Sequence, residues 1–349
     1  MGYLQNALDW VIEGAKALLY RSFVGGEDKG MYRGTTIGVI VPAYNEEELI
    51  GRVLETMPEY VDKIIVVDDA SDDHTSVVVR SYESSLSGRL ALIRHEVNRG
   101  VGGAIITGHR CALAEGMDVV AVMAGDAQMD PGELSQVLDP VIEGRADYTK
   151  GNRFFSGEAW QTMPKVRYFA NAALSMLTKI ASGHWHVADP QCGYTAISHQ
   201  ALETLNLDQL SRGYQFENSM LVYLNVLNLR VVDVPVRPIY GIGEDSGIQH
   251  GWAVLAFALY LARSFVWRLK EKYIIRDFHP LVFFYLFGLL FCPPGLLFGL
   301  YLLAYRLIVG PVQATSALFA MFLFTSGLQF LLFAMWFDKD YTDTARRWR

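Results

Sequence analysis

The segment from Gly125 to Asp130, GDAQMD, places three oxygen-bearing side chains within five residues, directly after an apolar run. Carboxylate and amide oxygens are the ligands that Mg²⁺ takes together with substrate phosphates, and Mn²⁺ suits the same ligands. We therefore predict that Asp126 and Gln128 bind a divalent cation, Mg²⁺ or Mn²⁺, beside a phosphate-bearing ligand.

The third of these side chains, Asp130, has a structural explanation. Pro131 follows it directly and Glu133 lies three residues on. An aspartate N-cap, a proline at the first helical position and a glutamate at the third form the pattern of a capping box. We assign Asp130 to a helix start and not to the metal.

Alternating apolar runs and helix-like segments must position this chemistry. The predicted strands are Thr36 to Val41, Lys63 to Val67, Leu90 to Arg94 and Val119 to Met123. The predicted helices are Glu46 to Met57, one from about Thr75, and Val101 to about Glu115. This rhythm predicts an α/β fold with a mostly parallel sheet and helices on both faces, and near-continuous apolar strands suit a sheet buried on both sides.

Polar residues follow each predicted strand. They are PAYNEE at 42–47, DDASDD at 68–73, Asn98 and Arg99, and the segment with Asp126. Because ligands bind outside the carboxyl ends of parallel strands, these residues should converge on one edge of the sheet. The chain has neither a GxGxxG turn of the right spacing nor a GxxxxGK[ST] loop, so phosphates should be met by a cation and by arginines.

Composition excludes several other classes. The chain has 349 residues and a formal net charge of −7, which is not the basic character of a nucleic-acid-binding protein, so we predict no nucleic-acid partner. Its three cysteines are far apart and form no disulfide framework or zinc motif. This usage favours a cytoplasmic location for the part that carries the site.

The C-terminal third is built differently. No charged side chain occurs from Pro280 to Tyr305, and after Arg306 the next charge is Asp338. Each stretch exceeds the roughly 20 apolar residues that a bilayer-crossing helix needs. Basic residues precede the first stretch and follow the second, so the positive-inside rule places both termini and the site-bearing domain in the cytoplasm.

Two further segments are amphipathic. Gly251 to Tyr273 has an apolar stretch too short to span and a basic, aromatic end, as expected of an interfacial helix. Tyr3 to Phe23 has apolar residues at helical spacing, and it either packs on the soluble domain or lies on the membrane. The predicted division is residues 1–34 for an N-terminal helix and linker, 35–245 for the catalytic domain, 246–279 for interfacial helices and 280–349 for a membrane domain.

The motifs VPAYNEEE, VVDDASDDHT, NRGVGGA, GDAQMDP, GNRF and DPQCGYTA, in this order, resemble the family 2 glycosyltransferases of GT-A fold. The resemblance covers about Thr36 to Pro238 and is strongest to the polyprenyl- and dolichyl-phosphate glycosyltransferases. It implies a membrane-anchored, inverting enzyme that moves a sugar from a UDP- or GDP-linked donor to a polyprenyl phosphate held by the lipid bilayer.

The resemblance also implies roles for residues of this chain. The donor nucleotide sugar would be bound by a set that follows the strands: Pro42, Tyr44, Asn45, Glu46, Val67, Asp68, Asp69, Asn98, Gly102 and Ala127. Asp126 and Gln128 match the family's metal ligands. Arg153, Arg167 and Asn171 would bind the acceptor phosphate, and Asp189 is a fourth predicted acceptor-binding residue. The predicted catalytic residues are Asp126, Arg153 and Arg167.

Departures from the family pattern leave alternatives open. Ala124 replaces the first aspartate of the usual Asp-x-Asp pair, and Gln215 replaces a lysine of the mannose synthases, which leaves UDP-sugars open as donors. A second hypothesis is transfer to another acceptor, such as a lipid-linked glycan or a polysaccharide. A hydroxyl acceptor needs a general base, for which Asp189 is the candidate. A third hypothesis is a non-catalytic nucleotide-sugar binder.

Overall fold

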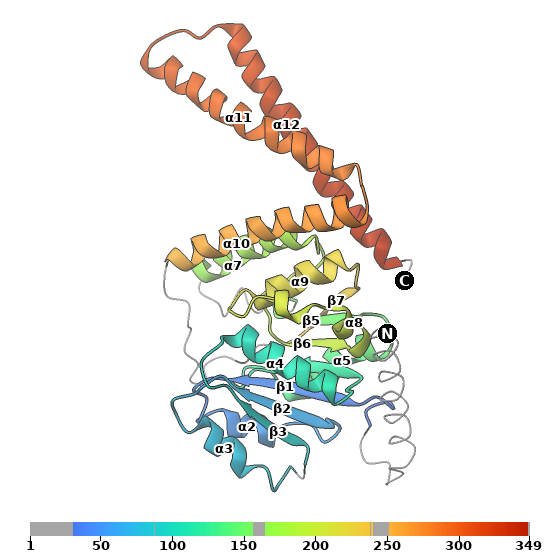
Figure 1. The fold of residues 1–349 in the computed structure, drawn as a ribbon. Coiled ribbons are helices and arrows are strands. Elements are labelled where there is room, and N and C mark those ends of the chain that lie inside the picture. The colour runs from blue at the N-terminus through green and yellow to red at the C-terminus, as the bar shows by residue number, and fades with distance from the viewer. Residues whose placement is uncertain (1–30, 87, 156–164, 238, 240–250, 348–349) are drawn as a thin grey trace, which may run out of the picture.

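The computed structural model describes residues 31–347 apart from residue 87 and residues 156–164, 238 and 240–250. The predicted N-terminal helix therefore lies outside the described residues, as does most of the linker that follows it. A seven-stranded sheet in the order β3-β2-β1-β4-β6-β5-β7 forms the centre of the soluble part (Figure 1). Its strands are β1 (Ile37–Ala43), β2 (Lys63–Asp68), β3 (Leu90–Arg94), β4 (Val119–Val122), β5 (Tyr148–Asn152), β6 (Thr195–Ser198) and β7 (Val231–Pro235).

The sheet is mixed but mostly parallel. β1 pairs in parallel with β2 and β4, β2 with β3, and β5 with β7. β6 runs antiparallel to both of its neighbours, β4 and β5. The first four strands lie where the apolar runs predict them, and β1, β2 and β4 carry buried side chains almost throughout, since helices cover both faces.

Two apolar cores, one on each face, hold the helices to the sheet. One face is covered by α2 (Ile50–Glu55), α3 (Thr75–Ser81) and α5 (Leu134–Ile142), which follows the short helix η1 (Pro131–Glu133). The other is covered by α4 (Val101–Ala114), α8 (His199–Thr204), η2 (Leu207–Gln209) and α9 (Phe216–Val226). The first predicted helix is shorter than expected because the chain after β1 forms a polar loop up to Leu49.

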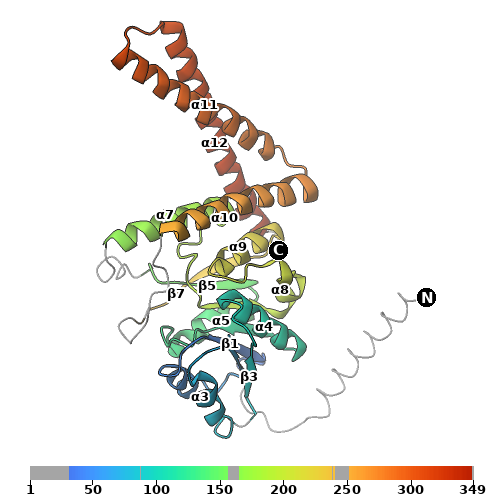
Figure 2. The same cartoon turned by 60° about the vertical axis from the view of Figure 1, so that its left-hand side comes forward.

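Two long helices lie side by side over the β5–β7 end of the soluble part, as Figures 1 and 2 show: α7 (Lys165–Ser182) and α10 (Gly251–Lys270). α10 packs against both α7 and α9 and continues into a π-helical segment, η3 (Glu271–Arg276). Its outer face exposes Leu259 and Val266. The predicted amphipathic helix therefore exists, with one face on the soluble domain.

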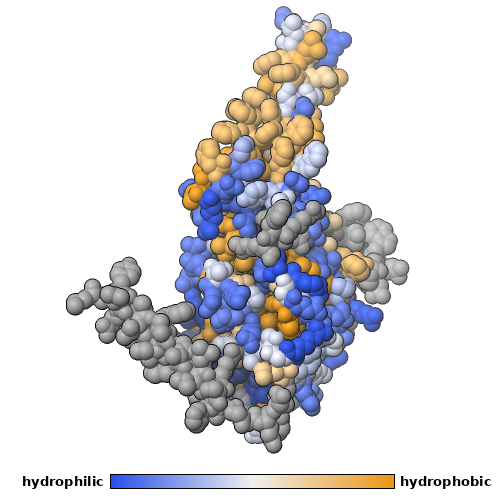
Figure 3. Space-filling model, turned by 90° about the vertical axis from the view of Figure 1, so that its right-hand side faces the viewer, coloured by the Kyte–Doolittle hydropathy of each residue, from blue (hydrophilic) through white to orange (hydrophobic). Residues whose placement is uncertain are grey.

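The chain ends in a helical hairpin of α11 (Leu281–Ile308) and α12 (Ala314–Arg347), which projects from the soluble part. Leu281–Ile308 and Ala314–Thr344 are long and apolar enough to cross a membrane, by length and composition. The hairpin surface is apolar over most of the face shown in Figure 3. Helix α11 continues through Pro293 and Pro294.

Glycines bring the two hairpin helices into backbone contact. A Cβ atom added at Gly327 would overlap the backbone of Cys292, and one at Gly295 would overlap that of Phe324. A Cβ atom at Gly299, on the same helix as Gly295, would meet nothing within 4 Å. Close approach at small residues is how helices associate in lipid, where apolar burial gives no driving force.

We expect Gly327→Ala to destabilise the hairpin by about 1–3 kcal/mol, because the methyl group overpacks a backbone contact. Gly299→Ala is the matched control, with an unchanged or higher melting temperature, since alanine favours a helix over glycine by about 1 kcal/mol. Melting temperatures of the full chain in detergent micelles measure both. Equal melting temperatures for the two variants would contradict the packing described.

Candidate active site

The loops after β1, β2 and β4 start next to one another at the carboxyl edge of the sheet. Main-chain hydrogen bonds continue past the strand ends: the amide of Asp69 donates to the carbonyl of Ala43 (2.9 Å), and that of Gly125 to Pro42 (3.1 Å). The structure thus brings together the predicted donor residues from segments more than eighty residues apart in the sequence.

Each of these three loops contains a non-glycine residue with a left-handed backbone. The φ angles are 55° at Asn45, 62° at Ala70 and 55° at Ala127. Asparagine tolerates this region through local hydrogen bonds, whereas alanine gains nothing to offset the strain. The side chain of Asn45 accepts from the amide of Asp72 (2.9 Å), which joins the first two loops. Strained turns of this kind gather at ligand-binding sites.

Carboxylates crowd the predicted donor side of the edge. Burial, followed by the charges of Asp126 and Asp73, raises the pKa of Glu46 to about 7. Asp126 accepts a hydrogen bond from the amide of Gln128 (3.0 Å), which fixes the turn that carries both predicted metal ligands. A bound cation would offset this concentration of negative charge.

Asp126 and Gln128 can hold a cation only when a bound ligand supplies the rest of its coordination. Among the residues that the structure describes, no group of three His, Cys, Asp or Glu side chains could enclose a metal ion. One carboxylate and one amide fit Mg²⁺ or Mn²⁺ if diphosphate oxygens supply the remaining positions, which is the usual arrangement at phosphate-transfer sites. The residues present therefore fit the predicted cation as a partner of the donor.

The two neighbouring aspartates at the end of β2 have different surroundings. Asp68 is fully buried and accepts from the amide of Ser71 (2.8 Å) and from the hydroxyl of Ser76, so it holds the loop together. Asp69 accepts from the amide of Arg99 (2.8 Å) and lies 2.6 Å from Nδ1 of His95. The Asp68 carboxylate is thus turned into the fold, while Asp69 joins two strand-end loops.

His95 is a residue of the site that the sequence analysis did not select. It is buried between Asp69 and the hydroxyl of Thr107 on α4 (2.9 Å). Its place directly after β3 was the available signal, since the same reasoning selected Asn98. His95 therefore belongs to the shell that orients Asp69.

Three predicted donor residues have evident local roles. Asn98 accepts from the amide of Gly100 (3.0 Å), which closes the turn before α4. Gly102 has no space for a side chain because a Cβ atom would overlap the backbone at Ser211. Val67 is fully buried in the sheet. These contacts explain the residue types through packing and turn geometry, and their predicted donor contacts stay predictions.

Asp130 caps a helix as predicted, but Glu133 does not complete a capping box. Asp130 accepts from the amide of Gly132 (2.8 Å) at the start of η1. Glu133 instead accepts from the amide of Arg237 (2.7 Å), just after β7. Glu133 bonds to Arg237 because the chain after β7 returns beside the loop that carries Asp126 and Gln128, which we call the metal loop. There the amide of Ile239 donates to the carbonyl of Gln128 (3.2 Å).

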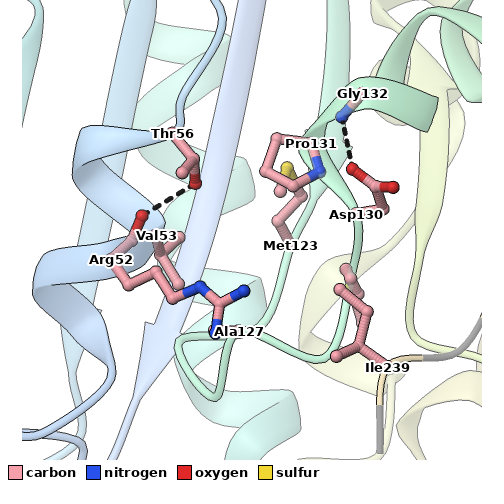
Figure 4. Close-up of a pocket in the computed structure, with 10 residues that line it drawn as sticks. Arg52, Val53, Thr56, Met123, Ala127, Asp130, Pro131, Gly132 and Ile239 are labelled. Carbon is pink, nitrogen blue, oxygen red and sulfur yellow. Dashed lines mark hydrogen bonds between the residues drawn. The ribbon is translucent and has the colours of Figure 1, made fainter.

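A cavity of about 300 Å³ lies behind the metal loop. It is lined by residues of α2, of η1 and of the segment between β4 and η1, and in Figure 4 the guanidinium group of Arg52 points toward Ala127. Met123 and Ile239 form part of its apolar wall. The loop that carries Asp126 therefore has a cationic side chain and open space behind it.

The predicted acceptor side contains a clamp between Arg153 and Asp189. Nε and Nη2 of Arg153 donate to the two carboxylate oxygens of Asp189 at 2.7 and 3.1 Å. Asp189 is 1% exposed. Asp147, another carboxylate close to Arg153 in the sequence, pairs with Arg230 at 2.9 Å. The guanidinium group of Arg153 is therefore held against a buried carboxylate from a distant segment.

A second buried ion pair, between β5 and α9, lies close to the segment that carries Asp189. The ammonium group of Lys150 on β5 donates to Glu217 of α9 (2.6 Å) and to the carbonyl of Cys192 (2.6 Å). Arg167 and Asn171 lie on the first turns of α7, and their side chains are outside the described part of the chain. Their predicted convergence with Arg153 stays a prediction.

This sheet and its strand-end loops define a glycosyltransferase domain of GT-A fold. A solved structure with the same fold is glucosyl-3-phosphoglycerate synthase from Mycobacterium tuberculosis in complex with Mn²⁺, UDP and glucosyl-3-phosphoglycerate. It has a TM-score of 0.50 and 19% identity, and the match covers 68% of this chain and 80% of that one. The predicted fold class is confirmed.

The chain belongs to glycosyltransferase family 2, and it is a glycosyltransferase. The model of that family, described as Glycosyl transferase family 2, matches residues 38–205. UDP-N-acetylglucosamine--dolichyl-phosphate N-acetylglucosaminyltransferase of Methanococcus voltae is 31% identical over 58% of this chain and 86% of its own length. Polyprenol monophosphomannose synthase of Mycolicibacterium smegmatis is 30% identical over 60% of this chain and 80% of its own length.

The crowding at Glu46 predicts a pH dependence of stability in metal-free protein. Because the folded state raises this pKa from 4.5 to about 7, the cost of ionising Glu46 is absent below pH 4.5, grows up to about pH 7 and is constant above it. Glu46→Gln removes that cost, so its melting temperature should rise above that of the wild type by a few degrees at pH 8 but not at pH 4.5.

Thermal unfolding in EDTA across this pH range measures the difference. Glu48→Gln, on an exposed side chain of the same loop, is the control and should follow the wild type. If the melting temperatures of Glu46→Gln and the wild type differed by the same amount at every pH, the raised pKa of Glu46 would be contradicted.

Proposed function

We propose that this enzyme transfers a sugar from a UDP- or GDP-linked donor to the phosphate of a polyprenyl or dolichyl phosphate, with inversion at the anomeric carbon. The observation that carries the proposal is the similarity to the two relatives named above. The name of the first contains a dolichyl phosphate, and the match covers 86% of its length. The name of the second contains polyprenol monophosphomannose, and the match covers 80% of its length. Two helices able to cross a membrane suit such an acceptor.

On the donor side, Asp126 and Gln128 would hold Mg²⁺ or Mn²⁺, and the other strand-end residues would bind the nucleotide. When bound, the cation neutralises the charge that develops on the leaving nucleoside diphosphate. Asp69, whose carboxylate is fixed by His95 and the Arg99 amide, would contact the nucleoside. Preorganised charge of this kind usually contributes more to the rate enhancement of an enzyme than any other single effect.

On the acceptor side, an oxygen of the lipid phosphate attacks the anomeric carbon while the bond to the diphosphate breaks. A phosphate monoester is mostly dianionic at neutral pH, so this nucleophile needs no base from the protein. The Asp189 carboxylate has both oxygens engaged by Arg153, which suits a positioning role and disfavours proton abstraction. This geometry supports the phosphate acceptor over a hydroxyl acceptor.

The division of the chain into four parts follows from this function. Residues 35–245 form the catalytic domain, residues 246–279 lie at the bilayer surface, and residues 280–349 anchor it. Both termini and the catalytic domain are cytoplasmic in this proposal, because the flanking basic residues follow the positive-inside rule. The amphipathic pattern of residues 1–34 suits contact with either the domain or the membrane.

The proposal predicts lipid-linked product from a defined mixture. Membranes containing the protein, a polyprenyl phosphate, Mn²⁺ and one labelled UDP- or GDP-sugar at a time should yield a labelled lipid with at least one donor. EDTA should abolish the product. No labelled lipid with any donor of either nucleotide would overturn the proposal.

Asp126→Ala should lower turnover by at least about 100-fold, because it removes the carboxylate that holds the cation at the leaving group. Asp130→Ala, four residues on, is the matched control: it removes a helix cap at a cost of about 1 kcal/mol and should retain turnover. Initial rates at saturating donor compare the two. Full activity in Asp126→Ala would mean that the metal ligand lies elsewhere.

Asp189→Asn separates the two acceptor chemistries. With a phosphate acceptor, weakening the clamp on Arg153 should raise KM for the lipid several-fold and leave measurable turnover, with no basic group lost from the pH–rate profile. With a hydroxyl acceptor, the same change removes the base and abolishes turnover. Steady-state rates from pH 5 to 9 distinguish these outcomes.

A further inference from the structure

A buried ionic cluster lies where the membrane hairpin meets the soluble domain, far along the chain from the candidate site. Its centre is Arg268 of α10, which is fully buried and donates to both carboxylate oxygens of Asp338 on α12, each at 2.8 Å. The hydroxyl of Tyr273 in η3 donates to the same carboxylate. Three helical segments therefore meet at one ion pair.

The same guanidinium group also holds the end of α7. Its Nε donates to the carbonyl of Ala181 (2.8 Å) and its Nη2 to that of Ile180 (3.1 Å). The chain turns away at Gly183, where φ is 74° and an added Cβ atom would overlap the guanidinium group. Arg268 thus satisfies carbonyls that a helix end leaves without partners, and its charge suits the negative end of the helix dipole.

A second cation closes the cluster toward α9. Lys272 donates to the side chain of Asn225 (2.9 Å), which in turn contacts the hydroxyl of Thr342 on α12 (3.4 Å). Burial, followed by the charge of Arg268, lowers the pKa of the Lys272 ammonium group to about 7. Separating a buried ion pair leaves an uncompensated charge and is strongly unfavourable, so the cluster favours this placement of the hairpin against α7 and α9.

That placement bears on the acceptor because α7 has the predicted phosphate-binding positions at its other end. Arg167 lies about 20 Å from Ala181 along the helix axis, at 1.5 Å per residue. A polyprenyl phosphate is a ligand in two parts, with its tail confined to the bilayer around the hairpin and its head at the soluble domain. The effective concentration of the head at the site depends on whether both parts can be accommodated at once.

We propose that the Arg268–Asp338 pair is a positioning element that sets the register between the membrane hairpin and α7, and so delivers the head of a membrane-held polyprenyl phosphate to the acceptor side of the site. The inference rests on the proposed function. It assigns a role in substrate use to residues that touch neither substrate nor cation.

The test compares two acceptors in proteoliposomes that contain the full chain: a long polyprenyl phosphate and a short, water-soluble prenyl phosphate. Asp338→Asn should raise KM for the long acceptor by about ten-fold through lost effective concentration, and Tyr273→Phe by about three-fold. KM for the short acceptor and for the donor should stay within about two-fold of wild type, because neither depends on the bilayer register.

Matched controls lie on the same elements. Asp340→Asn changes an exposed carboxylate two residues from Asp338, and Tyr341→Phe removes a hydroxyl that donates to exposed Asp277. Both should leave the two KM values unchanged. Asp338→Asn leaves a buried arginine without its partner, so if that variant does not fold, the milder Tyr273→Phe decides the test.

The outcomes distinguish the positioning role from the proposed function. Equal KM increases for long and short acceptors, or unchanged values in folded Tyr273→Phe and Asp338→Asn proteins, would overturn the positioning role and leave the proposed function intact. Failure of the wild-type protein to use either acceptor would overturn the proposed function itself, and the inference with it.

Discussion

Main-chain hydrogen bonds to β1 that continue past the ends of β2 and β4 are the constraint from which the rest of the site follows. The amide of Asp69 on the carbonyl of Ala43, and that of Gly125 on Pro42, keep three loops in register after the strands have ended. Because the loops leave the sheet side by side, each must turn sharply, and Asn45, Ala70 and Ala127 adopt left-handed backbones to do so. The strain is local, and the sheet is rigid enough to hold it.

At this edge of the sheet, the carboxylates around Glu46 lie apart from the guanidinium group of Arg153. Carboxylates gather on the donor side, where they raise the pKa of Glu46, and Arg153 stands on the other side in its clamp with Asp189. A diphosphate with a cation needs the first environment, and a phosphate acceptor needs the second. The antiparallel β6 lies between β4 and β5 in the sheet, so the strands that lead to Asp126 and to Arg153 are held apart by one intervening strand. In the proposed function, the sheet order would therefore set the distance between the donor and acceptor sites.

Strand positions and the converging edge could be predicted because both depend on local patterns: apolar runs, and polar residues at their ends. Other features depend on tertiary placement that no local pattern encodes. Glu133 has the spacing of a capping box but bonds to Arg237, which arrives from a hundred residues further on. Arg268 has the appearance of one flanking positive charge among several until α12 brings Asp338 to it. His95 looks like an ordinary loop histidine until Asp69 and Thr107 enclose it.

The glycine contacts of the hairpin have a mechanical consequence. Where Gly327 meets Cys292 and Gly295 meets Phe324, the two helices cannot slide or bend independently, so the hairpin acts as one rod. A rod whose apolar length differs from the local hydrocarbon thickness answers the mismatch by tilting as a whole. In the proposed membrane arrangement, with the base of the hairpin fixed to α7 by buried charge, such a tilt would move the catalytic edge relative to the headgroups. Bilayer thickness would then affect the catalytic rate, and turnover in vesicles of graded acyl-chain length would reveal it.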